Sequence, residues 1–423
     1  MEISQDKEFK KVITFKEISP RTRESYILTA TEFCQSIGKT YSEIISELKE
    51  QQYDFIQDNR IIRYDAEQGL TKEYINNYLI YIKEKGNKNS TINAKMMRIR
   101  TVLKESGVIL PKWNKLTEEK NKKNILLRKD LKFVLDVSNV HQKALFTFLL
   151  STGVRISDAL SFTIEDFIIS TYPNHQCVTL EDFLEKATDD MIGFWEFTPN
   201  KTKRAGLVCK VCNSQESTKY ILLSLKERIR LINQHNKRFG TDYQLEITDA
   251  LFSSRQKAHK GALTRTGVNS IFNEKENKLV DKKKKELLIS YKNKEITQKE
   301  YKEKLEKLPK FYPHSLRHYF ISHLRASGIN MQVSLLMEAH SSPNKMDEHY
   351  VGENEELFSE KNIREEYNKL LNRLTIEKKI SVDEYEELIK TKEQYKMMEE
   401  KWDKICEFYN QISDDNIIKR VKV

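Results

Sequence analysis

The stretch YPHSLRHYFISHLRASGINMQVSLLMEAHSSPNKMDEHYVG, residues 312–352, holds five of the nine histidines in the chain. Its first part has helical spacing, with His314 and Arg317 three residues apart on one face and Pro313 at a favourable first position. The N-terminus of a helix exposes unpaired N–H groups and the positive end of the helix dipole. The stretch therefore predicts a helix that binds an anion at its start.

A second basic residue follows the end of another predicted helix. In STGVRISDAL, residues 151–160, Gly153 stops an apolar helix and Arg155 follows. Because a planar guanidinium binds two phosphate oxygens at once, Arg155 and Arg317 are able to clamp one phosphate together. Tyr350, ten residues after His340, supplies an oxygen nucleophile.

Together these residue types suit phosphoryl transfer. A tyrosine that attacks a DNA phosphodiester forms a 3′-phosphotyrosine and releases a 5′-hydroxyl, which a lysine is able to protonate. Free tyrosine has a pKa of about 10, so a base or a cationic field must help to remove its proton. Each arginine that stabilises the charge on the phosphate contributes about 3 kcal/mol. Fixed cations replace a metal in this scheme, so we expect no metal and no cofactor.

Each residue also has a structural interpretation when it is taken alone. Arg155 could neutralise Asp158 or Glu165, His314 with Arg317 could cap a helix, and Tyr350 could be a buried aromatic residue. The four motifs in this order favour the catalytic interpretation over these.

These motifs resemble those of the tyrosine recombinases, the phage-integrase family that includes Xer-like site-specific recombinases. The family has an arginine after a TG helix end, then H-x-x-R, then a histidine in a GHSS-like segment, and then the nucleophilic tyrosine. Arg155, His314 with Arg317, His340 in EAHSS and Tyr350 match them, although Ala339 replaces the usual glycine. The family lysine lies in a β-hairpin turn, which is matched by PNKTKRAG at residues 199–206. The resemblance thus implies Lys203 as the catalytic lysine, with Lys201 as the alternative.

The resemblance implies a DNA integrase that cleaves and rejoins strands and exchanges them between two sites through a Holliday junction. It also implies a homo-tetramer on double-stranded DNA, and we expect the DNA to belong to a mobile element. Two other functions remain open: a type IB topoisomerase that relaxes DNA, and a non-catalytic DNA-binding protein that has kept the fold.

Composition agrees with a polyanionic partner. The 423 residues carry a formal net charge of +10, which favours nucleic acid over an anionic membrane surface. The five cysteines suit a reducing compartment, and no apolar run approaches the roughly 18 residues of a membrane span. We therefore expect a cytoplasmic, nucleoid-associated protein with no membrane partner.

The hydrophobic pattern predicts a mainly α fold with a small β-hairpin, in the α+β class. Apolar stripes such as Tyr26, Ala30, Phe33 and Ile37 predict an all-helical first domain. One of its helices should open at Asn89 or Ser90, either of which is able to cap it, and should present Lys95, Arg98 and Arg100 to DNA. The predicted boundaries are a helical core-binding domain over 15–110, a linker over 111–124, a catalytic domain over 125–355 with a lysine-rich insertion at about 278–310, and a helical, coiled-coil-like tail over 361–415.

Three segments leave alternatives. The lysine-rich insertion is predicted to be a solvated helical hairpin, and this is favoured over an arm that wraps DNA. The heptads of the tail, beginning with Ile363, Tyr367, Leu370 and Leu374, join protomers or pack back on the same chain. Cys209 and Cys212, with His175 and Cys177, form a weak candidate zinc site whose spacing matches no familiar module.

Overall fold

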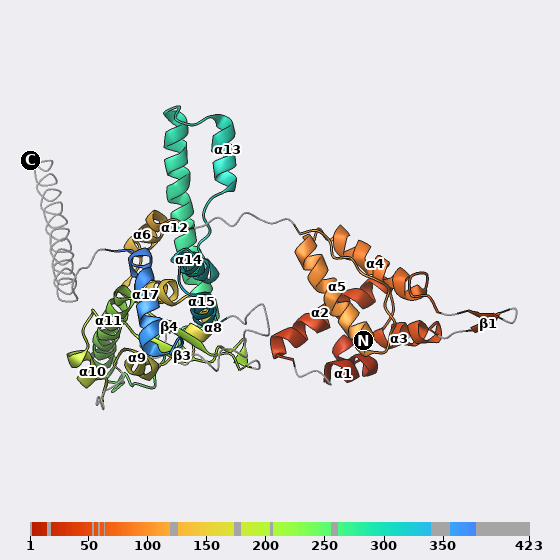
Figure 1. Cartoon of the computed structure of the whole chain (residues 1–423), viewed down its shortest axis with the longest axis horizontal. Coiled ribbons are helices and arrows are strands. Elements are labelled where there is room, and N and C mark those ends of the chain that lie inside the picture. The colour runs from red at the N-terminus through yellow and green to blue at the C-terminus, as the bar shows by residue number, and fades with distance from the viewer. Residues whose placement is uncertain are drawn as a thin grey trace, which may run out of the picture. The chain divides into compact units, whose positions relative to one another are not determined.

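The computed structural model divides the chain into two compact units, Met1–Lys122 and Lys123–Val423, shown in Figure 1. The described residues are 2–14, 18–52, 55–57, 60–62, 64–118, 126–172, 179–203, 206–254, 261–339 and 356–377. Among them, no helix is long and apolar enough to cross a membrane.

The first unit is a helical bundle around a small apolar core. Phe33, Tyr78 and Met96 are fully buried at its centre, and the burial of Ala30 and Phe33 confirms the helical face expected from their spacing. Ser19 caps α2 at its start, and Gly38 ends it in the left-handed conformation, with φ 77°. The elements are η1 Ile3–Gln5, α1 Lys7–Thr14, α2 Pro20–Ile37, α3 Tyr41–Glu50, β1 Phe55–Gln57, β2 Arg60–Ile62, α4 Leu70–Glu84 and α5 Asn89–Glu105.

Two details of this unit differ from the sequence predictions. It is not all-helical, because β1 and β2 form an antiparallel hairpin; strands of three residues are too short to show a period. The residue that caps α5 is Lys88, without a side-chain cap, and not Asn89 or Ser90. The Asn89 side chain instead donates to the carbonyl of Thr117, so a tertiary contact overrides the local capping preference.

The second unit wraps helices around α7 and places a two-stranded sheet beside it. Residues 143–152 of α7 are all buried, because α11 and α14 pack against it. The elements are α6 Arg128–Asp136, α7 Val140–Thr152, α8 Ile156–Ala159, α9 Ile164–Thr171, α10 Leu180–Lys186, β3 Phe194–Phe197, β4 Cys209–Cys212, α11 Gln215–Phe239, α12 Arg265–Lys292, α13 Gln298–Glu306, α14 Pro313–Arg325, α15 Met331–Glu338 and α17 Glu360–Leu374.

The predicted β-hairpin is present. β3 and β4 pair antiparallel, with Trp195 opposite Val211, and Trp195 is buried against Phe148 of α7 at a centroid distance of 5.0 Å. This contact fixes the hairpin to the helix that ends at Gly153. The fold class predicted from the sequence, mainly α with a small sheet, is confirmed.

The helix α17 packs on the same chain. Its residues Ile363, Tyr367, Leu370 and Leu374 are at most 1% exposed and belong to the core of the second unit. Of the two alternatives for this part of the tail, the structure therefore shows packing in cis. The later heptads, from Tyr385, lie outside the described residues.

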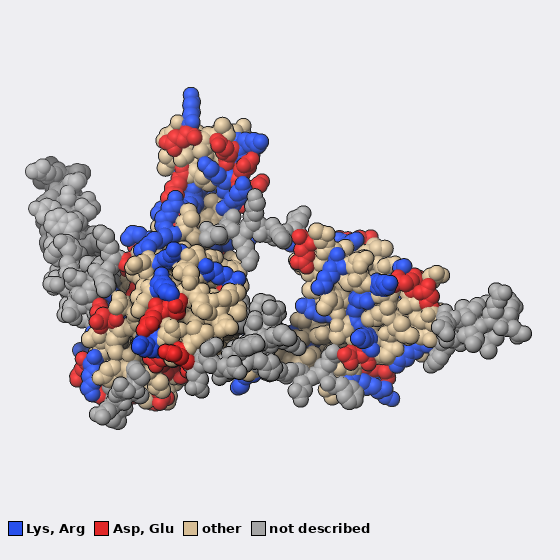
Figure 2. Space-filling model, viewed as in Figure 1, with Lys and Arg blue, Asp and Glu red and all other residues tan. Residues whose placement is uncertain are grey.

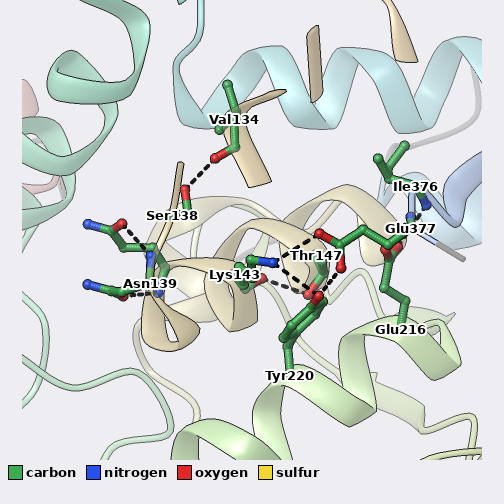
Figure 3. Close-up of polar contacts among 10 residues, drawn as sticks. Val134, Ser138, Asn139, Lys143, Thr147, Glu216, Tyr220, Ile376 and Glu377 are labelled. Atoms are coloured by element: carbon green, nitrogen blue, oxygen red, sulfur yellow. Dashed lines mark hydrogen bonds and ion pairs between the residues drawn. The ribbon is translucent and has the colours of Figure 1, made fainter. Parts of the chain in front are cut away.

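A buried polar network holds the residues that follow α17, as Figure 3 shows. Glu216, in the first turn of α11, accepts the backbone N–H groups of Ile376 and Glu377 at 2.9 and 2.8 Å. Glu377 in turn pairs with Lys143 at 3.0 Å and accepts from the Tyr220 hydroxyl. Burial raises the pKa of Glu216 to about 7, against the lowering effect of the two N–H donors.

Candidate active site

The predicted anion helix is α14, and Pro313 stands in its first turn as expected. Arg317 of this helix is 3% exposed. One end of its guanidinium donates to the carbonyl of Gly153 at 2.6 Å and the other donates to the carbonyl of Glu338. Arg317 therefore ties the end of α7 to the end of α15, and its own position is set by two backbone groups.

Both carbonyls belong to helix ends that turn into the left-handed region. Gly153 has φ 62°, and Ala339, directly after Glu338, has φ 50°. A Cβ on Gly153 would lie 2.2 Å from Cδ1 of Phe320, so only glycine fits here. Ala339 stands where the resemblance expects glycine, and its left-handed backbone explains why glycine suits this position.

Arg155 lies near Arg317, just after the end of α7. It is the N-cap residue of α8, two residues after Gly153, and is half-buried. Burial first, and then the nearby charge of Arg155, lower the pKa of Arg317 to about 10. Two close guanidinium groups repel each other, so the site favours an anion that contacts both.

The structural interpretation of Arg155, an ion pair with Asp158 or Glu165, is not what the structure shows. Among the described residues, no carboxylate lies within ion-pair distance of its guanidinium. Within this part of the chain, its charge is therefore not neutralised by a carboxylate.

Asp158 instead binds the backbone of the β3–β4 turn, an interaction that the sequence did not predict. It is 2% exposed, and its Oδ1 accepts the backbone N–H of Asn200 at 3.0 Å. Its Oδ2 is buried without a hydrogen-bond partner. Because Asn200 directly precedes Lys201, Asp158 holds the β3–β4 turn beside the helix that Arg155 starts. In the sequence, this role could have been inferred from the carboxylate that follows Arg155 by three residues.

The two candidate lysines both lie in this turn and are exposed. Thr202 donates its N–H to the carbonyl of Pro199 at 3.0 Å, and Gly206 donates to Lys203 at 3.1 Å. These turn contacts do not choose between Lys201 and Lys203, and both stay predictions.

His314 lies in the first turn of α14 and is exposed, with its ring 4.3 Å from the ring of His318. His340 and Tyr350 lie outside the described residues. The described chain does reach Ala339, and the carbonyl before it is bound by Arg317. The end of the described segment, at Glu338 and Ala339, is thus tied to Arg317.

Several other tyrosines of this unit are engaged in the core. Tyr367 donates to the carbonyl of Ser151 at 2.8 Å, and Tyr319 donates to that of Arg373 at 3.3 Å. Burial raises the pKa of both hydroxyls. A neutral, buried phenol that already donates its proton is a poor nucleophile.

The zinc candidates are not assembled in the described part of the chain. Cys209 and Cys212 are three residues apart on β4 and are buried, and burial raises the pKa of each thiol to about 12. A metal ligand must be a thiolate, which such pKa values disfavour. His175 and Cys177 lie outside the described residues, and the described ones contain no cluster of three ligands.

Two of the three basic residues predicted to contact DNA in the first unit have partners within it. Lys95 pairs with Glu32 at 2.8 Å, and Arg100 donates to the carbonyl of Pro111 at 2.7 Å. Arg98 is half-buried. A role of the three in DNA binding stays a prediction.

No family model and no curated protein matches the sequence. Solved structures do match. One of a Tn1549 transposon integrase in complex with transposon right end DNA is 15% identical, covers 85% of this chain and 100% of its own, and has a TM-score of 0.45. The XerA recombinase is 15% identical, with coverage of 82% and 96% and a TM-score of 0.28. A lambda integrase dimer bound to a core site is 11% identical, with coverage of 81% and 92% and a TM-score of 0.38.

These structures are tyrosine recombinases. They are of the family that the sequence motifs resemble.

Proposed function

We propose that this protein is a site-specific DNA recombinase that acts through a covalent 3′-phosphotyrosine. The observation that carries the proposal is the pair Arg155 and Arg317. One of these guanidiniums is buried and held by two carbonyls, and the other stands at the start of a helix, where no carboxylate of the described residues pairs with it. Such an arrangement suits a phosphate that gains charge as it reacts.

In the proposed reaction, Tyr350 gives up its phenol proton to solvent, its Oη attacks the phosphorus atom, and the bond from phosphorus to the 5′-oxygen breaks. Lys203, or Lys201 in its place, gives a proton to that 5′-oxygen. Arg155, Arg317, His314 and His340 bind the non-bridging oxygens. In the return step, the 5′-hydroxyl of another strand attacks the phosphotyrosine and Tyr350 leaves. The energy of the broken bond is kept in the phosphotyrosine, so rejoining of the strands should not need ATP.

Strand exchange between two sites requires that protomers pair on DNA, and we propose a homo-tetramer with both units contacting the duplex. The mobile-element context belongs to the same proposal. Its support is the long insertion at 278–310, most of which forms a helical hairpin outside the core.

The test uses nicked duplex libraries, in which the short strand after the cut diffuses away and traps the adduct. After nuclease and protease digestion, mass spectrometry should find a nucleotide on the peptide that contains Tyr350. Tyr350→Phe should remove the adduct and keep DNA affinity. An adduct on another tyrosine contradicts the assignment.

Two further outcomes separate the alternatives. Relaxation of supercoiled DNA without any special site would favour a topoisomerase. DNA binding that survives Arg155→Ala and Arg317→Ala, with no adduct ever formed, would favour a non-catalytic binding protein.

A further inference from the structure

The lysine-rich insertion forms an arm that stands out from the second unit. The arm comprises residues 281–310: the second half of α12, the connection, α13 and the chain that leads to α14. The last buried residue of α12 is Leu279, so the 13 residues to Lys292 extend about 20 Å beyond the core, at ~1.5 Å per residue. Figure 1 shows α12 and α13 side by side, away from the rest of the unit.

The arm contributes little to the core. α13 has no buried residue, and the two helices are held together at the tip by Tyr291 and Tyr301, whose rings stack at 5.1 Å. A capping box of Thr297 and Glu300 starts α13. The arm is therefore a helical hairpin that adds little to the core of the unit, and its root contacts α6 through Lys282 and Lys283.

Charge is concentrated on the arm. Residues 281–310 contain eleven lysines and six acidic residues, a net charge of +5, which is half of the +10 of the whole chain. Figure 2 shows lysine and arginine side chains along it, with acidic ones between them. A purely solvated helix would gain nothing from this excess, because like charges at fixed positions repel one another.

Most of these lysines form no ion pair within the part of the chain that the structure describes. Lys283 pairs with Asp130 at 2.8 Å, and Lys282 lies over the ring of Phe133 at 4.2 Å and pairs with Glu286 at 4.0 Å. The others are exposed, and no described carboxylate forms an ion pair with them: Lys284, Lys285, Lys292, Lys294, Lys299, Lys302, Lys304, Lys307 and Lys310.

The cationic surface continues into a groove at the root of the arm. The groove has a volume of about 520 Å³ and lies between α6, α12 and the chain after α13. Lys129, Lys283, Lys304 and Lys307 line it, together with the carboxylates of Asp130 and Glu286, which both contact Lys283. A row of exposed lysines along a helical hairpin fits a row of regularly spaced anions.

We propose that the arm binds the phosphate backbone of duplex DNA outside the segment held at the active site. The inference rests on the proposed function for the identity of the polyanion. Duplex DNA carries one charge per ~1.7 Å of its axis, so the ~20 Å of free helix matches the backbone of about six base pairs. Lysine acts there as a point charge and reads no sequence, so the arm adds affinity and no base preference.

The experiment measures the affinity of the full chain for random-sequence duplexes of increasing length and at several salt concentrations. The variant Lys284→Gln, Lys285→Gln, Lys292→Gln and Lys299→Gln should bind long duplexes at least tenfold more weakly. Each lost phosphate contact should lower the slope of log affinity against log salt by about 0.9. On the shortest duplex that still binds, the variant and the parent should agree.

Two matched controls test whether charge is the cause. Arginine at the same four positions keeps the charge and should keep both the affinity and the salt slope. Glu303→Gln together with Glu306→Gln makes the arm more positive and should tighten binding to long duplexes. A melting curve of each variant checks that the fold is retained, which is expected because the substituted side chains are exposed.

Unchanged DNA affinity and salt slope in the glutamine variant would overturn the proposal. If the same variant instead failed to self-associate, the arm would be a contact between protein chains; Ile289, 59% exposed near its tip, is suited to such a contact. The adduct assay on Tyr350 is separate. A missing adduct would refute the proposed function, whereas loss of length-dependent binding concerns only the arm.

Discussion

Positive charge is buried and oriented at the arginine site, whereas on the arm it is exposed to solvent. At the site, Arg317 is 3% exposed and two backbone carbonyls fix its guanidinium. On the arm, exposed lysines such as Lys284 and Lys299 form no ion pair with any residue that the structure describes. A charge that stabilises a reacting phosphate must already be oriented, and burial strengthens its effect. A charge that only attracts a polyanion works from solvent and is screened by salt.

Loss of the buried arginine should give the largest effect. Arg317→Ala removes one clamp on the phosphate and leaves the carbonyls of Gly153 and Glu338 without their donor. We expect adduct formation on nicked duplexes to fall by about a thousandfold. Arg317→Lys keeps the charge but cannot bind both carbonyls and a phosphate, and should still lose about a hundredfold.

DNA affinity is the control for this prediction. Because one phosphate contact is a small part of the interface, affinity should fall less than tenfold in both variants. Equal losses in affinity and in cleavage would mean that Arg317 serves binding alone, as the arm lysines do.

The second prediction concerns the backbone on which Arg317 rests. Gly153→Ala places a Cβ at 2.2 Å from the ring of Phe320 on a left-handed backbone. The free energy of unfolding of the second unit should fall by about 3 kcal/mol or more. Denaturant unfolding measures it.

Gly240→Ala is the matched control. Gly240 ends α11 with φ 64° and has no atom within 4 Å of an added Cβ. This substitution should lower the free energy of unfolding by about 1 kcal/mol, because an alanine in a left-handed backbone is strained but meets no neighbouring atom. If the two variants were equally stable, close packing at Gly153 would not be what supports the site.

The third prediction uses pH, which acts on buried charge. The pKa of Glu216 is about 7, above its usual 4.5, because the carboxyl is buried. Between these values the folded protein holds a proton that the unfolded chain has lost. The free energy of unfolding should therefore fall as pH rises through this window, by up to about 3 kcal/mol.

Glu216→Gln should remove that dependence, because glutamine does not titrate. Its carbonyl oxygen still accepts an N–H group from the segment after α17. Urea unfolding from about pH 4.5 to about pH 8 compares the two proteins. A parent protein with no slope in this window, or a slope that survives the substitution, would contradict the assignment.

The smallest effect is expected from Asp158, which acts through the turn that it holds. Asp158→Ala frees the N–H of Asn200 and should slow cleavage about tenfold without changing DNA affinity. Asp158→Asn keeps an oxygen acceptor and should restore most of the rate. Equal losses in both variants would show that the charge of Asp158 matters and not its hydrogen bond.

Local patterns in the sequence were sufficient for much of the fold. Apolar spacing predicted α2, the spacing of His314 and Arg317 predicted α14, and the predicted β-hairpin is the pair β3 and β4. They failed for β1 and β2, which are too short to show a period, and for the cap of α5, where Asn89 turns to Thr117.

The sequence by itself determined the order of the candidate catalytic residues, because each motif is a short run of side chains whose chemistry does not depend on distant contacts. Only the tertiary structure decided how they are supported. The Arg317 guanidinium meets a carbonyl 164 residues away, Asp158 reaches across to the β3–β4 turn, and α17 packs in cis. Such contacts join segments whose separation along the chain carries no periodic signal, and they form only when the core brings those segments together.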